Sequence, residues 1–237
     1  MTPRSMYHFG AALLIILGML LASCGKQQDH LMKVTRTSLH TITSMTVLTS
    51  NEQQAQQAID AAYRELDRLG QMLNFYADDS EIANINKNAG VSPVRVSPET
   101  FEIIQKAVFA SENTEGAFDA TVGPLVKLWD FKKGIVPDKD DIEDLLDQVG
   151  YKNIVLDASA QTVYLKEEGA QIDLGGILKG YAADKASLVL QKNGLSSGIV
   201  TVGGEVRAFG NKPDGTPWIV GIQNPRQKGP NDEVIAT

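Results

Sequence analysis

The sequence predicts an α+β fold in which helices cover an antiparallel or mixed sheet. Two long stretches in the first half carry apolar residues at steps of three and four, which is the spacing of a helix face. The second half instead holds short apolar segments separated by Gly, Asn and Pro. Because strands and helices do not alternate strictly, this order favours pairing of neighbouring strands over repeated strand–helix–strand units.

In the first half, residues 34–50 alternate Thr or Ser with apolar side chains, which predicts an edge strand or a hairpin. Two long helices are predicted, because Asn51 and Ser97 precede them as N-caps and Pro98 occupies a first helical position. These helices span residues 52–75 and 98–115. Residues 78–86 predict a turn that enters a short helix, residues 121–131 are helix-like, and residues 138–149 form an acidic segment.

In the second half, one helix is predicted from Gly175 to about Asn193. Strands are predicted at residues 153–157, 162–166, 197–202, 205–209 and 218–222. A soft division near Pro137 and one continuous domain are equally consistent with the sequence, because no linker marks a boundary.

Composition excludes several classes of function. The 237 residues carry a net charge of −7 and no long basic run, which argues against nucleic acid as a partner. The three histidines, His8, His30 and His40, all precede the central motifs. Neither a Ser-His-Asp triad nor a His-rich zinc site can therefore be built from those motifs.

The N-terminus has the layout of a signal peptide over residues 1–23, with an apolar run at 9–21. Its Leu-Ala-Ser-Cys ending resembles the bacterial lipoprotein cleavage site, with Cys24 as the lipidated first residue. A plain signal peptide or a short anchor helix is the alternative, although the run is short for a membrane span. We expect export in either case, with residues 24–33 as a polar tether.

The segment 171–186 predicts an anion-binding helix start. An apolar approach ends at Asp173, Gly175 and Gly176 let the backbone come close to a ligand, and Lys179 lies one turn into the helix. Such a site suits a phosphate or pyrophosphate. The alternative is a strand–turn–helix junction in which Asp173 merely caps the helix and Lys179 points into solvent.

Two further segments are candidates for ligand contact. In residues 114–124 a helix ends at Gly116 and a new one begins near Asp119, which could face a polar ligand or could cap a helix corner with Phe118 in the core. Residues 202–207 predict a hairpin with a Gly-Gly turn. Glycine-bounded turns with Asp and Lys are most compatible with a phosphorylated cofactor whose phosphates are shared with a hard cation such as Mg²⁺.

These segments, in this order behind a lipoprotein cleavage site, resemble the FAD:protein FMN transferase (ApbE) family from about Val34 to the last residue. The matching motifs lie at residues 116–125, 173–184, 202–207 and 218–225. The resemblance implies an ApbE-like fold and a Mg²⁺-dependent enzyme that transfers FMN from FAD to a Thr or Ser hydroxyl of a target protein and releases AMP. It also implies a lipid-anchored protein, on the periplasmic face of the inner membrane, whose acceptor is a membrane redox subunit.

The resemblance also carries residue roles. The residues implied as FAD contacts are Tyr76, Ala117, Phe118, Asp119, Asp173 and Lys179. Tyr76 matches the family's flavin-contacting aromatic residue, and the backbone carbonyl of Gly176 matches a position that helps to hold Mg²⁺. No catalytic residue is assigned.

The sequence departs from the family pattern at two places. The family usually shows Met-Gly-Thr or Met-Asp-Thr on its first strand, whereas this chain has Thr41-Ile42-Thr43-Ser44-Met45-Thr46. Family members also continue beyond residues 224–226 into a segment that supplies the side-chain ligands of Mg²⁺. We therefore expect residues 34–237 to form an incomplete transferase domain, as a fragment or as a truncated product with weakened or absent activity.

Two other functions remain open at this stage. A non-catalytic flavin-binding or flavin-trafficking lipoprotein would keep the cofactor turns without the metal ligands. A solute-binding lipoprotein of a transporter would need two similar lobes, and the sequence shows no such duplication.

Overall fold

The computed structural model describes residues 28–130, 132–226 and 234–236, so the predicted signal peptide and Cys24 lie outside the described residues. Within these ranges no helix combines the length and apolarity needed to cross a bilayer. The helices are α2 (Glu52–Met72), α3 (Glu81–Lys87), α4 (Pro98–Asn113), α5 (Gly123–Val126), α6 (Lys139–Glu143), α7 (Gly175–Lys192) and the 3₁₀ turns η1 (Leu146–Gln148) and η2 (Tyr151–Asn153). The strands are β1 (His30–Ser38), β2 (Thr41–Thr49), β3 (Val94–Arg95), β4 (Ile154–Asp157), β5 (Thr162–Leu165), β6 (Gly198–Val202), β7 (Glu205–Phe209), β8 (Ile222–Gln223) and β9 (Val234–Ala236).

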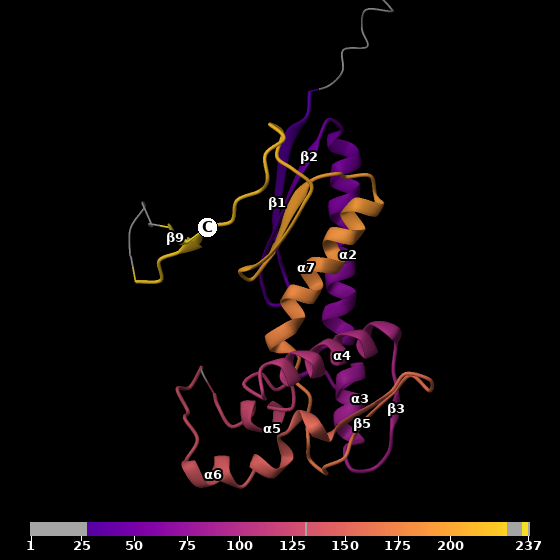
Figure 1. Cartoon of the computed structure of the whole chain (residues 1–237), viewed down its shortest axis with the longest axis vertical. Coiled ribbons are helices and arrows are strands. Elements are labelled where there is room, and N and C mark those ends of the chain that lie inside the picture. Colours follow the sequence, from indigo (N-terminus) through magenta and orange to yellow (C-terminus); the bar gives the residue numbers. More distant parts are fainter. Residues whose placement is uncertain (1–27, 131, 227–233, 237) are drawn as a thin grey trace, which may run out of the picture.

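The main sheet has the strand order β1-β2-β6-β7 and is antiparallel throughout. Helices α2 and α7 cross one of its faces side by side (Figure 1). Inward side chains alternate along the strands, so Met45 and Val47 of β2 and Val200 and Val202 of β6 are fully buried. This antiparallel sheet under two helices confirms the predicted α+β class.

A second, smaller layer lies at the other end of the molecule. There the sheet β3-β5-β4 packs with α3 and α4, and α2 runs the length that joins it to the main sheet (Figure 1). Val163 and Leu165 of β5 and Ile103 and Ile104 of α4 are buried in one continuous apolar core with the residues of the main sheet. Both layers therefore share a core that α2 and α7 span.

The helices begin where the sequence places their caps. The Asn51 side chain accepts a hydrogen bond from the Gln54 amide at 3.0 Å, and the Ser97 hydroxyl accepts one from the Thr100 amide at 3.2 Å. Each cap satisfies an amide that has no partner within its helix. The predicted turn before the short third helix is also confirmed, with Ser80 as its cap.

The hairpin predicted at residues 34–50 is confirmed, but it is longer than expected. Strand β1 begins at His30, where it pairs with Thr49 of β2, so residues 30–33 belong to the sheet and not to the predicted tether. The predicted Gly-Gly hairpin between β6 and β7 is confirmed as well. Gly203 and Gly204 have φ of +58° and +103°, which glycine adopts without steric cost.

Two predicted elements are wrong in extent. The helix expected at residues 121–131 is reduced to α5, because Asp130 pairs with Ile135 across a tight turn. The strand expected at residues 218–222 is absent except for Ile222, since the Trp218 indole donates instead to the Ser197 hydroxyl at 3.1 Å and the Phe209 carbonyl at 3.2 Å. An apolar segment forms a strand only where a partner strand is in reach.

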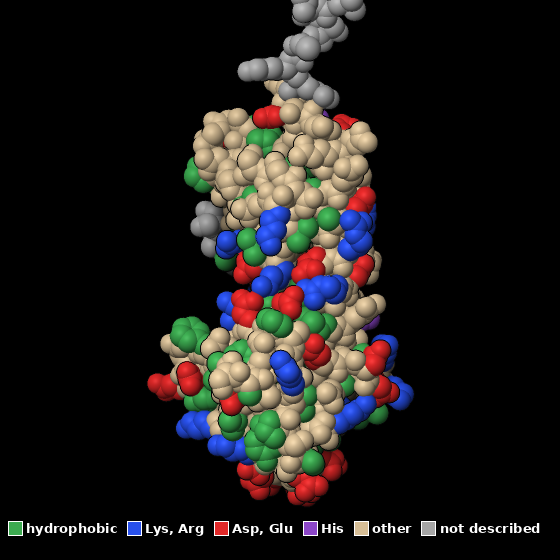
Figure 2. Space-filling model, turned by 90° about the vertical axis from the view of Figure 1, so that its right-hand side faces the viewer, with side chains coloured by type: hydrophobic (Ala, Val, Ile, Leu, Met, Phe, Trp, Pro, Cys, Tyr) green, Lys and Arg blue, Asp and Glu red, His purple; other side chains and the backbone are tan. Residues whose placement is uncertain are grey.

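Charged side chains gather in a band at mid-height, where the two layers meet (Figure 2). Arg68 of α2 donates to Glu65 and to Glu99 of α4, each at 2.8 Å. Lys185 of α7 donates to Glu102 of α4 at 2.7 Å. These pairs tie α4 to both α2 and α7, and so hold the two long helices in register.

Candidate functional site

A cavity of about 1000 Å³ lies between the C-terminal end of α2 and the start of α7. That volume is at the upper end of the range of about 300–1000 Å³ for small-molecule sites. One side, which we call the α7 wall, consists of Asp173, Gly175, Leu178 and Lys179. The opposite side, the α2 wall, consists of Leu39, His40, residues 67, 68 and 70–77, Asp79 and Glu81.

The α7 wall begins with a tight turn at Asp173. The Asp173 carboxylate accepts a hydrogen bond from the Gly175 amide at 2.8 Å, and the Asp173 amide donates to the Ala120 carbonyl at 2.8 Å. Gly175 and Gly176 are exposed in the first turn of α7. Amides at a helix start, together with the helix dipole, attract anions, so this wall suits a phosphate group.

Lys179 lies in the cavity lining, one turn into α7. Its stem passes the β6–β7 turn so closely that a Cβ on Gly203 would lie 3.0 Å from Lys179 Cδ and 2.9 Å from the Thr41 side chain. Gly203 therefore leaves room for the lysine. The alternative prediction was a junction in which Asp173 caps and Lys179 points into solvent. Asp173 does cap the turn, but the Lys179 side chain is half-buried in the cavity lining.

The second candidate segment packs directly against the first. Val122 pairs with Gln171, and the Gly123 amide donates to the Gln171 carbonyl at 3.1 Å. A Cβ on Gly123 would lie 2.5 Å from that carbonyl oxygen, which explains the glycine. Residues 116–124 and 171–176 thus form one unit behind the α7 wall.

Asp119 uses both carboxylate oxygens within this unit. One oxygen accepts from the Thr121 amide at 2.7 Å and hydroxyl at 2.6 Å, and the other accepts from the Tyr151 amide at 2.8 Å. The Phe118 ring lies against Gly176, 3.0 Å from the position of a Cβ there. Ala117, Phe118, Asp119 and Gly176 thus lie beside the cavity but outside its lining. In this geometry Asp119 holds a turn, as the alternative prediction for that segment states.

Tyr76 lies on the α2 wall and is 76% exposed. Its ring meets the edge of Phe75 at 5.0 Å between centroids, and its amide donates to the Asn74 side chain at 2.9 Å. The Asn74 carbonyl in turn accepts from the Ser80 hydroxyl at 2.6 Å. An exposed ring on a well-held turn is suited to stacking against a planar ligand.

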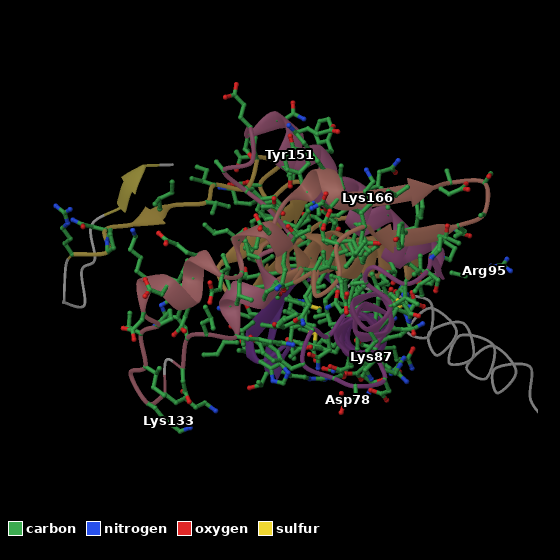
Figure 3. All side chains as sticks on the ribbon, turned by 90° about the horizontal axis from the view of Figure 1, so that it is seen from below. Asp78, Lys87, Arg95, Lys133, Tyr151 and Lys166 are labelled. Atoms are coloured by element: carbon green, nitrogen blue, oxygen red, sulfur yellow. The ribbon has the colours of Figure 1, made fainter. Side chains whose placement is uncertain are left out.

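The turn that carries Tyr76 is also held at its outer edge. Figure 3 shows Asp78 and Lys87 close together on the periphery, where the Lys87 ammonium donates to the Asp78 carbonyl at 2.7 Å. Lys87 belongs to α3, so this contact fastens the turn to the helix that follows it. The backbone around Tyr76 is therefore fixed from both sides.

The charges of the cavity are mostly satisfied within the chain. On the α2 wall, Asp67 accepts from the Ser38 hydroxyl at 3.0 Å, and Glu81 accepts from the Ser97 amide at 2.9 Å. The Arg68 guanidinium donates hydrogen bonds to Glu65 and Glu99. Lys179, in contrast, makes no ion pair within the described residues. The ammonium group best placed to meet an anionic ligand is therefore that of Lys179.

Sequence reasoning missed Leu39 and His40, which form the β1–β2 turn and line the cavity. Their φ angles are +50° and +58°, in the left-handed region that a leucine rarely adopts. The expected contact was sought at residues 41–46, which lie in β2. A Leu-His pair lacks the Asn or Gly that marks such turns, so the available signal was Gly70 in the last turn of α2, where a Cβ would lie 2.7 Å from Leu39 Cδ2.

The α7 wall is anchored from behind by Tyr181. Its hydroxyl donates to Glu102 of α4 at 3.0 Å, and burial raises the pKa of Tyr181 to about 12. The hydrogen bond from Lys185 holds the pKa of the same Glu102 carboxyl below its usual range. These contacts keep the first turns of α7 rigid relative to α4.

Comparison with known proteins gives one consistent family. The profile of the ApbE family matches residues 39–237. The FAD:protein FMN transferase of Treponema pallidum is 31% identical over 195 residues. The crystal structure of the ApbE protein of Thermotoga maritima is 32% identical with a TM-score of 0.78, and the flavin transferase ApbE of Vibrio cholerae is 26% identical with a TM-score of 0.73.

The chain spans about half the length of the curated relatives it matches. The Treponema pallidum alignment covers 76% of this chain and 54% of that protein. The two structural alignments cover 87% and 83% of this chain, and 66% and 65% of the solved chains.

Proposed function

Because the chain belongs to the ApbE family, we propose that it acts as an FAD:protein FMN transferase. The reaction transfers FMN from FAD to a Thr or Ser hydroxyl of an acceptor protein and releases AMP. The names of the relatives, FAD:protein FMN transferases, support the transferase class and FAD as substrate. Transfer to a Thr or Ser hydroxyl and release of AMP are part of what we propose.

The observation that carries the proposal is the make-up of the cavity. An exposed aromatic ring, Tyr76, lines the same cavity of about 1000 Å³ as the start of α7 and the ammonium-bearing Lys179. A dinucleotide such as FAD presents a planar ring and a diphosphate together. The two walls therefore offer one complementary group to each part of that ligand.

The proposed step is a substitution at phosphorus. The acceptor oxygen forms a bond to the phosphorus that carries the riboflavin moiety, the bond from that phosphorus to the AMP oxygen breaks, and the hydroxyl proton leaves. Such transfers depend chiefly on positioning and on neutralising the phosphate charge. The amides at the start of α7 and the Lys179 ammonium are placed to supply both.

The predicted Mg²⁺ would, when bound, neutralise charge on the diphosphate. The described residues include no group of three or more His, Cys, Asp or Glu side chains able to hold a metal. Asp173 already accepts from Gly175, and a carbonyl in a helical first turn points along the helix towards the residue four positions on. The described part of the chain thus does not fit a complete Mg²⁺ site, so Gly176 remains a family-based prediction and no step is assigned to the metal.

We propose that the protein is exported and lipid-anchored through Cys24 on the periplasmic face of the inner membrane. The proposed acceptor is a membrane redox subunit. Strand β1 begins at His30, six residues after Cys24. An extended chain of that length reaches about 20 Å, so the anchor would hold the main sheet close to the bilayer and its membrane partners.

Transfer is tested with the full chain, FAD, Mg²⁺ and an acceptor peptide that contains one Thr. We expect covalent flavin fluorescence on the denatured peptide, a mass increase equal to FMN minus water, and stoichiometric AMP. A peptide with Val in place of Thr is the matched control. FAD retained without transfer would favour the alternative, a non-catalytic flavin-binding lipoprotein, and absence of FAD binding would refute both.

A further inference from the structure

Lys127 contacts the aromatic pair of the α2 wall from outside the cavity. Its ammonium nitrogen lies 4.9 Å from the centroid of the Phe75 ring. The Phe75 ring in turn meets Tyr76 at 5.0 Å with an interplanar angle of 78°. The Lys127 ammonium therefore contacts the Phe75 ring, and the Phe75 ring contacts the Tyr76 ring, which lines the cavity.

The same lysine belongs to the unit behind the α7 wall. It directly follows α5, which begins at Gly123, and the Gly123 amide is bonded to Gln171 two residues before Asp173. One path of direct contacts thus runs from the helix start to Tyr76. It connects the two walls through contacts that lie outside the cavity lining.

Tyr76 needs such support, because its ring is largely exposed. Its backbone is fixed by Asn74 and Ser80, but the Phe75 edge is the aromatic contact of its ring. Phe75 is half-buried and could turn unless it is held on its far face. A cation over a ring is attracted by the negative face of the π system, and this contact supplies that restraint.

We propose that Lys127 is a positioning residue for flavin binding. Through Phe75 it holds the Tyr76 ring in the orientation that stacks on the ligand, and it connects that ring to the α7 wall. The inference rests on the proposed function, in which FAD occupies the cavity. Lys127 lies outside the cavity lining and acts through Phe75.

The first test needs no ligand. In the full chain with ¹³C-labelled tyrosine rings, the Tyr76 signal is assigned by comparison with Tyr76→Leu and is measured by NMR. Lys127→Met, which keeps the apolar stem and removes the charge, should shift and broaden the Tyr76 signal, and Lys127→Arg should restore it. The control Lys166→Met removes the same charge from an exposed site outside the cavity lining and should change nothing.

The second test uses FAD. We expect Lys127→Met to weaken FAD binding about two- to fivefold, the usual effect of one exposed cation–π contact. It should also reduce the quenching of flavin fluorescence by the stacked tyrosine, with rescue of both by Lys127→Arg. In a double-mutant cycle with Phe75→Leu the two losses should not add, because both act through one contact.

The outcomes separate the two proposals. If Lys127→Met leaves the unliganded Tyr76 signal unchanged, the positioning role is refuted whether or not FAD binds. If that signal changes as expected but the unaltered protein binds no FAD, the contact series stands as a structural feature while the transferase proposal fails, and the role in flavin binding fails with it. Additive losses in the cycle would also overturn the inference, since Lys127 would then act independently of Phe75.

Discussion

The two walls of the cavity are built in different ways. The α7 wall comes from seven consecutive residues, 173–179, whose turn is closed locally by the Asp173 carboxylate and the Gly175 amide. The α2 wall combines a hairpin turn, a helix end and a loop. Leu39 lies beside Gly70, and Phe75 is contacted by Lys127, which lies outside the wall. A short motif is therefore enough to specify the anion-binding α7 wall, whereas the aromatic α2 wall depends on long-range packing.

The largest expected effect is on the α7 wall. Reversing the charge with Lys179→Glu should weaken FAD binding on the order of a hundredfold, because a hydrogen bond to a charged group is lost and repulsion of the diphosphate is added. Isothermal titration calorimetry measures this, with Lys166→Glu as the charge-matched control. An affinity equal to that of the control would show that the α7 wall does not meet the diphosphate.

The next effect concerns the α2 wall. Tyr76→Leu should weaken FAD binding about tenfold, since stacking of a base on an aromatic side chain contributes about 1–3 kcal/mol. The exposed ring contributes little to the folded state, so the melting temperature should stay nearly constant. Tyr76→Phe keeps the stacking face and should keep most of the affinity. Equal losses in the Leu and Phe variants would assign the effect to the hydroxyl instead.

A smaller effect tests whether the α2 wall depends on long-range packing. Gly70→Ala places a methyl group 2.7 Å from Leu39 Cδ2 and should displace the β1–β2 turn, lowering FAD affinity a few-fold. The overpacking cost of about 1–3 kcal/mol is partly offset by a helix-propensity gain of about 1 kcal/mol. The free energy of unfolding, from urea titration, should therefore fall by only about 0–2 kcal/mol.

Gly180 offers the matched control for that substitution. It lies within α7, and a Cβ there meets nothing within 4 Å. Gly180→Ala should raise the free energy of unfolding by up to about 1 kcal/mol and leave FAD binding unchanged. If Gly70→Ala behaved in the same way, the Leu39 turn would not be part of the binding wall.

The smallest effect concerns the ion pair that fixes α7 on α4. The hydrogen bond from Lys185 lowers the pKa of Glu102 below its ordinary value of 4.5 in the folded state. Its stabilisation is therefore present above that value and is lost as the pH falls through the folded-state pKa. Because Glu102 is well exposed, we expect at most about 1 kcal/mol.

That pH dependence is measured by comparing melting temperatures of the unaltered protein and Lys185→Met. The difference should be present at neutral pH and should shrink as the pH falls below about 4.5. A difference that stays constant down to about pH 3 would show that Lys185 stabilises by packing on Tyr181, whose ring centroid lies 4.8 Å from its ammonium, and not through Glu102.

Much of the fold followed from local chemistry. The caps Asn51 and Ser97 begin their helices as predicted, and alternation along residues 34–50 gives the hairpin. The strand predicted at residues 218–222 depended on a distant partner and was predicted wrongly. Residues 218–221 have strand-forming side chains, but Trp218 bonds to Ser197 and Phe209 and leaves them unpaired.

By itself the sequence determined the α7 wall, because Asp173, Gly175 and Lys179 lie within seven consecutive residues and their relation is set by local backbone geometry. Only the tertiary structure decided that Leu39 and His40 complete the cavity lining. It also decided that the Asp119 carboxylate accepts hydrogen bonds from Thr121 and Tyr151. The physical reason is the sequence separation between the residues that interact. A turn or cap is decided by hydrogen bonds between residues two to four apart, whereas a wall assembled from separate elements depends on which surfaces the shared core brings together.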